Sequence, residues 1–260
     1  RYPYIIQGAT AFGGAYYFAA TYNNSEALKP KNYSNGYIVK YVVAEKNNES
    51  SWIIGRWLKS EKLTNLKHTV VITGSVGKTT TKEMVACVME QSGETLKTEG
   101  NFNNEIGVPK TLFRLSDTTK NAVIEMGMDG FGQISVLAKC AKPDCAIITN
   151  VGVSHIENLG SREGILQAKL EMLDGLKKGS SLFLNGDNDM LSTVKNDDYN
   201  IVFFGIENKN CDILAEDINE IGLSTEFVAV KGDIRQKITI PTVGIHNVYD
   251  ALSAFAVGLE

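Results

Sequence analysis

The stretch 69-TVVITGSVGKTTT-81 joins a run of β-branched residues to a glycine-rich loop and then to a series of threonines. A strand followed by glycine, lysine and threonine at the start of a helix is typical of a loop that binds phosphate. The usual pattern, G-x-x-x-x-G-K-[ST], has a glycine five residues before the second glycine. Counted back from Gly77, that position is Ile72. The sequence therefore predicts a shorter form of the loop, and a plain strand–turn–helix junction is the alternative.

The residues of this loop have distinct chemical roles in that interpretation. Backbone N–H groups of residues 74–77 can surround phosphate oxygens, helped by the positive end of the following helix. Lys78 adds a positive charge, and the hydroxyl of Thr79 can bind Mg²⁺. The predicted nucleotide-binding residues of the loop are Gly74, Ser75, Val76, Gly77, Lys78, Thr79 and Thr80.

From residue 67 onward, short apolar runs alternate with stretches of helical periodicity. We expect strands at residues 69–73, 94–98, 121–126, 145–149, 180–184 and 200–204. We expect helices at residues 78–92, 107–115, 132–141, 162–178, 187–196 and 246–259, and an antiparallel edge over 212–240. This alternation predicts βαβ crossovers. The fold class is therefore α/β, a mostly parallel sheet with helices on both faces, as in a P-loop ATPase-type central domain over residues 67–260.

Residues 1–66 have a different pattern, because eight of the ten tyrosines fall before residue 42. We expect a small N-terminal domain and a connector, with a helical stretch at 51–63. Residues 2–25 carry no charge, but proline, glutamine and glycines interrupt them and few are strongly apolar. A spanning helix needs about 20 predominantly apolar residues, so we expect no membrane insertion.

Composition limits the class of protein. The formal net charge is −4, so there is no basic surface of the kind that binds nucleic acid. The four cysteines include no C-x-x-C pair, which suits a reduced, intracellular protein without a disulfide framework or a zinc site.

In a parallel sheet, ligands gather at the carboxyl ends of the strands. The segment 98-TEGNFNN-104 follows one of these ends. Asparagine amides both donate and accept hydrogen bonds, so they suit a polar, sugar-bearing substrate; ordinary turn formation is the alternative. The candidate substrate-binding residues are Thr98, Asn101, Asn103 and Asn104.

Three further side chains are candidates for catalysis. Glu125 ends an apolar strand, where a carboxylate is costly unless it is paired or bound to a metal. His155 lies a few residues beyond the next strand, and a structural role is its alternative. Lys169 falls in the middle of the apolar face of its helix. Either its amine reaches past its neighbours to solvent, or it is occupied inside the site.

Five successive segments closely resemble those of the Mur ligase family. They are TGSVGKTTTKEM, TEGNFNNEIGVP, EMGM, TNVGVSHIENLGSREGI followed by AKLE, and GIHNVYDALSA. The resemblance covers about residues 67–260. The family's loop has the short form T-G-S-x-G-K-T-T, which accounts for the missing glycine.

The resemblance implies an ATP-dependent ligase of peptidoglycan precursor synthesis. In such a ligase, phosphoryl transfer from ATP turns a carboxylate into an acyl phosphate, which an amine then attacks. The implied substrates are UDP-N-acetylmuramoyl-tripeptide and D-alanyl-D-alanine, and the implied cofactors are ATP and Mg²⁺. We expect a cytoplasmic monomer.

The resemblance also assigns roles residue by residue. Thr79 and Glu125 match the ligands of one magnesium ion, and His155 matches a ligand of a second. Lys169 matches a lysine that becomes carbamylated and so able to serve a metal site. His246 and Asn247 match the segment that contacts the nucleotide. With Lys78, the expected catalytic set is Lys78, Glu125, His155 and Lys169.

Other classes of nucleotide-binding protein share parts of this pattern. Amino-acid-adding Mur ligases have D-H-x-D where this chain has 154-SHIE-157, and folylpolyglutamate-type ligases usually have G-K-G-S in the loop. A catalytically silent NTP-binding regulatory module would have no reason to combine Glu125, His155 and Lys169. The family's C-terminal domain, which brings the incoming dipeptide, is expected to be absent from residues 1–260. We therefore expect this stretch alone to be inactive as a ligase.

Overall fold

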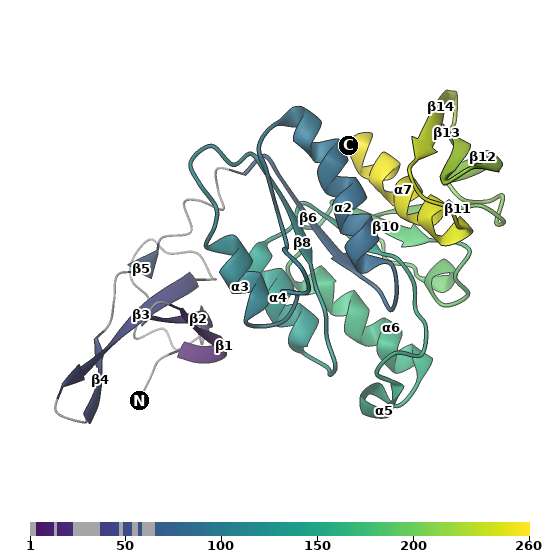
Figure 1. The fold of residues 1–260 in the computed structure, drawn as a ribbon. Helices are drawn as coiled ribbons and strands as arrows, with labels where there is room; N and C mark the ends of the chain where they lie inside the picture. Colours follow the sequence, from purple (N-terminus) through teal and green to yellow (C-terminus); the bar gives the residue numbers. More distant parts are fainter. Residues whose placement is uncertain (1–3, 13–14, 23–36, 47–48, 54–56, 59–65) are drawn as a thin grey trace.

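The computed structural model describes residues 4–12, 15–22, 37–46, 49–53, 57–58 and 66–260. Within these residues the strands form two separate sheets, one of five strands and one of nine (Figure 1). No helix in the described part of the chain is long and apolar enough to cross a membrane.

The five-stranded sheet is antiparallel and comes from the N-terminal segment. Its strands are β1 (Tyr4–Phe12), β2 (Ala15–Tyr22), β3 (Tyr37–Lys46), β4 (Glu49–Ile53) and β5 (Trp57–Leu58). The order is β1-β2-β3-β4, and β5 also pairs with β3.

The helix expected at 51–63 is wrong where the structure describes it. Residues 51–53 belong to β4, and Trp57–Leu58 form β5. Residues with aromatic and β-branched side chains favour strands as well as helical faces, and Trp52 lies opposite Val43 in the β3–β4 register. The remainder of that stretch lies outside the described residues.

The nine-stranded sheet has the order β14-β13-β12-β11-β10-β9-β6-β8-β7. Its parallel strands are β6 (His68–Thr73), β7 (Thr95–Lys97), β8 (Asn121–Glu125), β9 (Cys145–Ile148), β10 (Ser181–Asn185) and β11 (Asn200–Gly205). Strand β12 (Ile213–Ile221) runs parallel to β11, and β13 (Ser224–Lys231) and β14 (Ile234–Ile240) complete an antiparallel edge. The predicted α/β fold and the antiparallel edge over 212–240 are confirmed.

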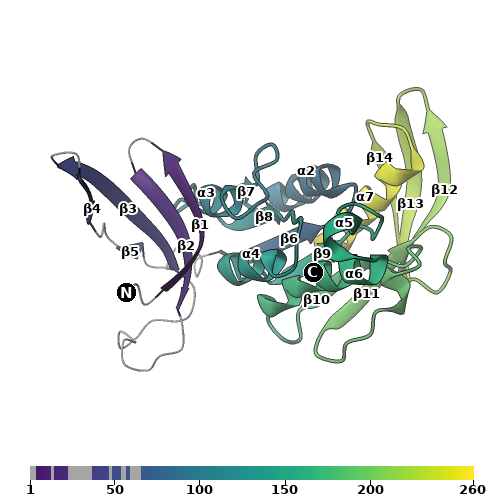
Figure 2. The ribbon, with the colours of Figure 1, turned by 90° about the horizontal axis from the view of Figure 1, so that it is seen from below.

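Helices cover both faces of this sheet. They are α2 (Lys78–Met89), α3 (Gly107–Leu112), α4 (Gln133–Ala141), α5 (Ile156–Leu159), α6 (Arg162–Leu170) and α7 (Ile245–Gly258). Figures 1 and 2 show α2 beside α7, away from α4 and α6. Strand residues alternate between the two layers: Val70 and Ile72 pack with α2 and α7, and Val71 packs with α3, α4 and α6.

The helix expected at 187–196 is wrong, because within it only Leu191–Thr193 form a single 3₁₀ turn. Polar side chains capture the backbone there: Asn185 Oδ1 accepts the N–H of Asp187, and Asn188 Oδ1 accepts that of Leu191. Asparagine and aspartate compete with helix in this way. The expected helix 162–178 is also shorter; α6 ends at Leu170 and a 3₁₀ turn follows over Glu171–Asp174.

Candidate active site

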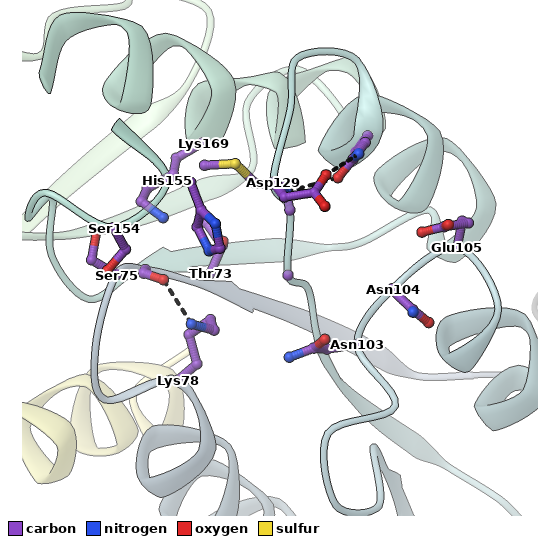
Figure 3. A pocket seen from close by; sticks show the side chains of 14 residues that line it. Thr73, Ser75, Lys78, Asn103, Asn104, Glu105, Asp129, Ser154, His155 and Lys169 are labelled. Atoms are coloured by element: carbon purple, nitrogen blue, oxygen red, sulfur yellow. Dashed lines mark hydrogen bonds between the residues drawn. The ribbon is translucent and has the colours of Figure 1, made fainter. Parts of the chain in front are cut away.

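The carboxyl ends of the central parallel strands surround a cavity of about 300 Å³ (Figure 3). Seven predicted site residues line it together, although they are up to 95 positions apart in the sequence: Gly74, Ser75, Lys78, Asn103, Asn104, His155 and Lys169. Thr73, Glu105, Gly127, Met128, Asp129, Gln133 and Ser154 complete the lining. The sheet therefore brings the predicted residues to one place.

The loop between β6 and α2 requires its glycines. Gly77 has a φ of +86°, and a Cβ on it would lie 2.8 Å from Asp250 Oδ1. A Cβ on Gly74 would collide with the hydroxyl oxygen of Thr149. The loop can therefore take this tight shape only with glycine at both positions.

Lys78 folds back across the loop, where its amine donates to Gly74 O at 2.9 Å. Burial lowers the pKa of Lys78, and the nearby charge of Glu125 partly opposes that shift. A cation is thus held at the start of α2, where the helix dipole already favours an anion.

Two of the loop's N–H groups are used inside the protein. Ser75 N and Val76 N each donate to Asn150 Oδ1 at 2.9 Å. We expected these two groups to surround phosphate oxygens. In this structure the protein's own amide takes that place.

Glu125 is 1 % exposed and is held from two sides. Its Oε2 accepts the Thr79 hydroxyl at 3.0 Å, and its Oε1 accepts Asn103 Nδ2 at 2.7 Å. The two residues predicted to bind the first magnesium, Thr79 and Glu125, are therefore in direct contact.

The polar residues of the segment 98–104 have different surroundings in the structure. Thr98 is fully buried and accepts the backbone N–H of Glu125 at 3.0 Å, so its predicted contact with substrate is corrected to a supporting role. Asn101 is exposed and is not among the pocket residues. Asn104 lines the pocket, but its Oδ1 also accepts the N–H groups of Ile106 and Gly107 at the start of α3.

His155 and Lys169 reach the pocket from the segment after β9. His155 is exposed and has a left-handed backbone with φ of +64°, directly before α5. Lys169 is 3 % exposed on α6, so its amine does not escape to solvent. Burial, with the positive charge of Lys78 as a second cause, lowers the pKa of Lys169 to about 7.

His246 and Asn247 do not belong to this pocket. Asn247 Nδ2 donates to Val243 O at 2.7 Å and so stabilises the turn before α7. The same helix carries Asp250, which sequence reasoning did not select; its Oδ1 accepts the Thr81 hydroxyl at 2.7 Å. Nothing in the sequence pairs Asp250 with a loop more than 160 positions earlier.

No cluster of three His, Cys, Asp or Glu side chains in the described part of the chain is close enough to hold a metal ion. The oxygen pair of Thr79 and Glu125 is the part of the predicted metal set that lies in direct contact. Hydroxyl and carboxylate oxygens are ligands that Mg²⁺ prefers when phosphates complete its shell. His155 and Lys169 line the pocket, whereas Thr79 and Glu125 are not among its lining residues, so the four do not form one cage.

Asp250 gives a prediction for stability against pH. Burial raises the pKa of the Asp250 carboxyl from 3.8 to about 6, and the Thr81 hydrogen bond opposes part of the shift. Between those values the folded chain binds more protons than the unfolded one, so this group makes stability fall as pH rises. Asp250→Asn keeps an acceptor for Thr81, and should raise the free energy of unfolding by roughly 1–3 kcal/mol above pH 6.

Urea unfolding at neutral and acidic pH measures this effect. The gain of Asp250→Asn should shrink as pH falls toward 3.8. Asp117→Asn, at an exposed position, is the matched control and should change stability little. An equal gain at both pH values would show that ionisation of Asp250 is not the cause.

Known proteins match the part of the chain that carries this site. Residues 72–258 match the Mur ligase middle domain. The UDP-N-acetylmuramoyl-tripeptide–D-alanyl-D-alanine ligase of Bacillus subtilis (strain 168) is 42% identical over 187 residues, which are 72% of this chain and 40% of the relative.

Solved structures agree with the sequence comparison. A crystal structure of MurF from Acinetobacter baumannii superposes with a TM-score of 0.70 at 31% identity, over 76% of this chain and 44% of that chain. The structure of MurF ligase from Thermotoga maritima in complex with ADP gives a TM-score of 0.68 at 30% identity, over 76% of this chain and 46% of that chain.

The chain spans less than half the length of each of these relatives. The matched region nevertheless covers most of the nine-stranded sheet, its helices and the whole pocket described above. The chain belongs to the Mur ligase family.

Proposed function

We propose that the protein is an ATP-dependent amide-bond ligase that joins D-alanyl-D-alanine to a UDP-N-acetylmuramoyl-tripeptide. The observation that carries the proposal is the pocket itself, in which Lys78 of the loop and the buried Lys169 face one cavity from opposite walls (Figure 3). The names of the relatives supply the substrates, and the complex of the Thermotoga protein with ADP supports an adenine nucleotide.

The nucleotide phosphates would lie at the first turn of α2. That turn leaves backbone N–H groups without acceptors inside the helix, and its dipole is positive there. Lys78 adds a cation that remains beside the phosphoryl group throughout the transfer. Its role is to stabilise the charge that the transferred group carries between ATP and the acceptor carboxylate.

The acceptor carboxylate is a poor electrophile until it carries a phosphate. Its oxygen attacks the γ-phosphorus of ATP and ADP leaves, which gives an acyl phosphate. The amine of D-alanyl-D-alanine then attacks the acyl carbon, phosphate leaves, and the amine loses a proton. The amide side chains of Asn103, Asn104 and Gln133 line the cavity and can orient the polar substrate.

Magnesium fits the contact between Thr79 and Glu125. A carboxylate that is 1 % exposed and holds a hydroxyl at 3.0 Å offers two hard oxygen ligands beside the loop. When bound there, Mg²⁺ neutralises phosphate charge. Asn103 fixes the second oxygen of Glu125 and so sets the orientation of the carboxylate.

Glu125→Gln tests this placement. The amide keeps the shape of the side chain but loses the charge that holds a divalent cation. We expect that Mg²⁺ no longer increases the affinity for a non-hydrolysable ATP analogue, whereas the wild type shows about a tenfold or larger increase. Calorimetric titration with and without Mg²⁺ measures the effect. Glu157→Gln, at an exposed position of α5, is the control, and a Mg²⁺ response that survives in Glu125→Gln would contradict the assignment.

Substrate choice decides between the proposed function and its alternatives. Thermal-shift measurements should respond to UDP-N-acetylmuramoyl-tripeptide and not to folate. With the family's C-terminal domain also present, ADP release should respond to UDP-N-acetylmuramoyl-tripeptide together with D-alanyl-D-alanine, and not to folate with glutamate. A response to a shorter muropeptide and a single amino acid would favour another Mur-type ligase. Nucleotide binding with no response to any acceptor would favour a silent NTP-binding module.

We also propose that the protein has two parts, residues 1–66 and 67–260. It would be a cytoplasmic monomer without a nucleic-acid partner. The separate N-terminal sheet supports the division into two parts, and the net charge of −4 supports the absence of a nucleic-acid partner.

A further inference from the structure

The first half of the phosphate loop is tied to the segment that follows β9. Asn150 Oδ1 accepts the N–H groups of Ser75 and Val76, each at 2.9 Å. The hydroxyl of Thr149 donates to Val76 O at 2.6 Å, and the N–H of Gly152 donates to Ser75 Oγ at 2.9 Å. We call Thr149 and Asn150 the β9 clasp.

The clasp fills an anion-binding geometry with a neutral oxygen. Two consecutive N–H groups that converge on one oxygen form a nest of the kind that binds phosphate in glycine-rich loops. Here the oxygen belongs to the Asn150 side chain. The first half of the loop is therefore satisfied within the protein, and the first turn of α2 keeps the N–H groups that lack helical acceptors.

The clasp is itself held from the other side. Arg162 donates to Val151 O at 2.9 Å while it forms a two-pronged ion pair with Asp189, at 2.7 and 2.6 Å. Asn188 Nδ2 donates to the same carbonyl of Val151 at 3.3 Å. Because the backbone next to Asn150 is fixed in this way, we expect the Asn150 side chain to stay bound to the loop when phosphate is present.

The position of the missing glycine explains why support is needed. Ile72 occupies that position, is fully buried, and still belongs to β6, which ends at Thr73. The loop is thus limited to residues 74–77. So short a loop has no preceding turn of its own to hold its N–H groups in place.

We propose that the β9 clasp is a positioning device for nucleotide binding, which takes the place of the longer loop's first turn and leaves the phosphates to Lys78 and the start of α2. The inference rests on the proposed nucleotide site. It adds a specific division of labour, in which residues 75 and 76 shape the loop without contacting phosphate through their N–H groups.

Asn150→Ala tests the clasp by calorimetry with Mg²⁺ and a non-hydrolysable ATP analogue. The variant should bind at least about tenfold more weakly, because the loop loses the acceptor that holds two N–H groups. Asn196→Ala is the matched control: its side-chain oxygen also accepts a backbone N–H, from Asp198 at 3.0 Å, in a loop away from the pocket. The control should bind as the wild type does.

A second variant keeps the test valid if Asn150→Ala does not fold. Thr149→Val preserves the shape of the side chain and removes only the donor to Val76, so it should weaken binding in the same direction by about threefold. Melting temperatures without nucleotide are measured in parallel. A residue with a purely structural role would lower the melting temperature but leave the affinity of the folded protein unchanged, and that result would overturn the proposal.

The remaining outcomes are also decisive. Tighter binding by Asn150→Ala would mean that phosphate displaces the amide, which overturns the positioning role. Weak binding by Lys78→Ala with normal binding by both clasp variants would overturn the clasp and leave the nucleotide site standing. A wild-type protein that binds no nucleotide would instead refute the proposed function.

Discussion

Lys78→Ala is expected to weaken the binding of Mg-ATP by about 10- to 100-fold while the fold is retained. The side chain supplies a charge-assisted contact to phosphate, and such contacts contribute about 1.5–3 kcal/mol. Lys78 also donates a hydrogen bond to Gly74 O within the protein. Because that acceptor is an uncharged carbonyl, losing this bond costs less than losing the contact with phosphate. Calorimetry with a non-hydrolysable analogue measures the affinity.

Lys177→Ala is the control for this result, because Lys177 is exposed and lies outside the pocket. The variant Lys78→Ala carries a second readout. Since the charge of Lys78 contributes to the lowered pKa of Lys169, its removal should raise that pKa. Unchanged affinity in a folded Lys78→Ala protein would remove the loop from the nucleotide site.

Lys169 is expected to form a carbamate with dissolved CO₂ at a pH where ordinary lysines do not. The neutral amine is the reactive form: its nitrogen attacks the carbon of CO₂ and loses one proton. Because burial lowers the pKa of Lys169 to about 7, a large fraction is neutral at about pH 8. Exposed lysines, with pKa values of about 10.4, stay charged there. The modification replaces a buried amine with oxygen ligands of the kind that the proposed magnesium ion would prefer.

Carbon-13 NMR with labelled bicarbonate detects this product directly. A carbamate signal should appear above pH 7, weaken as the pH falls below it, and be missing in Lys169→Ala. In ligation assays of a protein that also carries the family's C-terminal domain, Lys169→Ala should lose most activity and regain part of it when short carboxylic acids are added. A signal that persists in Lys169→Ala would assign the carbamate to another amine, and a protein without any signal would have an unmodified lysine.

The sequence predicted the parallel sheet and seven of the fourteen residues that line the pocket, because these depend on local signals. The β-branched run before Gly74 and the glycines themselves specify a strand, a tight turn and a helix. Lys169 was recognisable because a charge in the middle of an apolar face contradicts the helical pattern. Each of these signals is contained within a few residues.

The predictions failed where the outcome depends on distant partners. Thr98 could not be recognised as a support for Glu125, since the hydrogen bond joins the residue after β7 to the end of β8, 27 positions away. Asn150 and Asp250 gain their roles only when β9 and α7 lie against the loop. The helix expected at 187–196 did not form because the side chains of Asn185 and Asn188 accept backbone N–H groups there, a competition that hydrophobic periodicity does not reveal.

Two opposite walls of the pocket belong to different helix layers, and each layer packs in its own hydrophobic core on one face of the sheet. Lys78 belongs to the α2 layer and Lys169 to the α6 layer, and the charge of one lowers the pKa of the other. The packed sheet holds the two amines in place, and the charge of Lys78 favours the neutral form of Lys169 before any ligand arrives. An anion that enters the cavity would offset the charge of Lys78 and so raise the fraction of Lys169 that carries a proton.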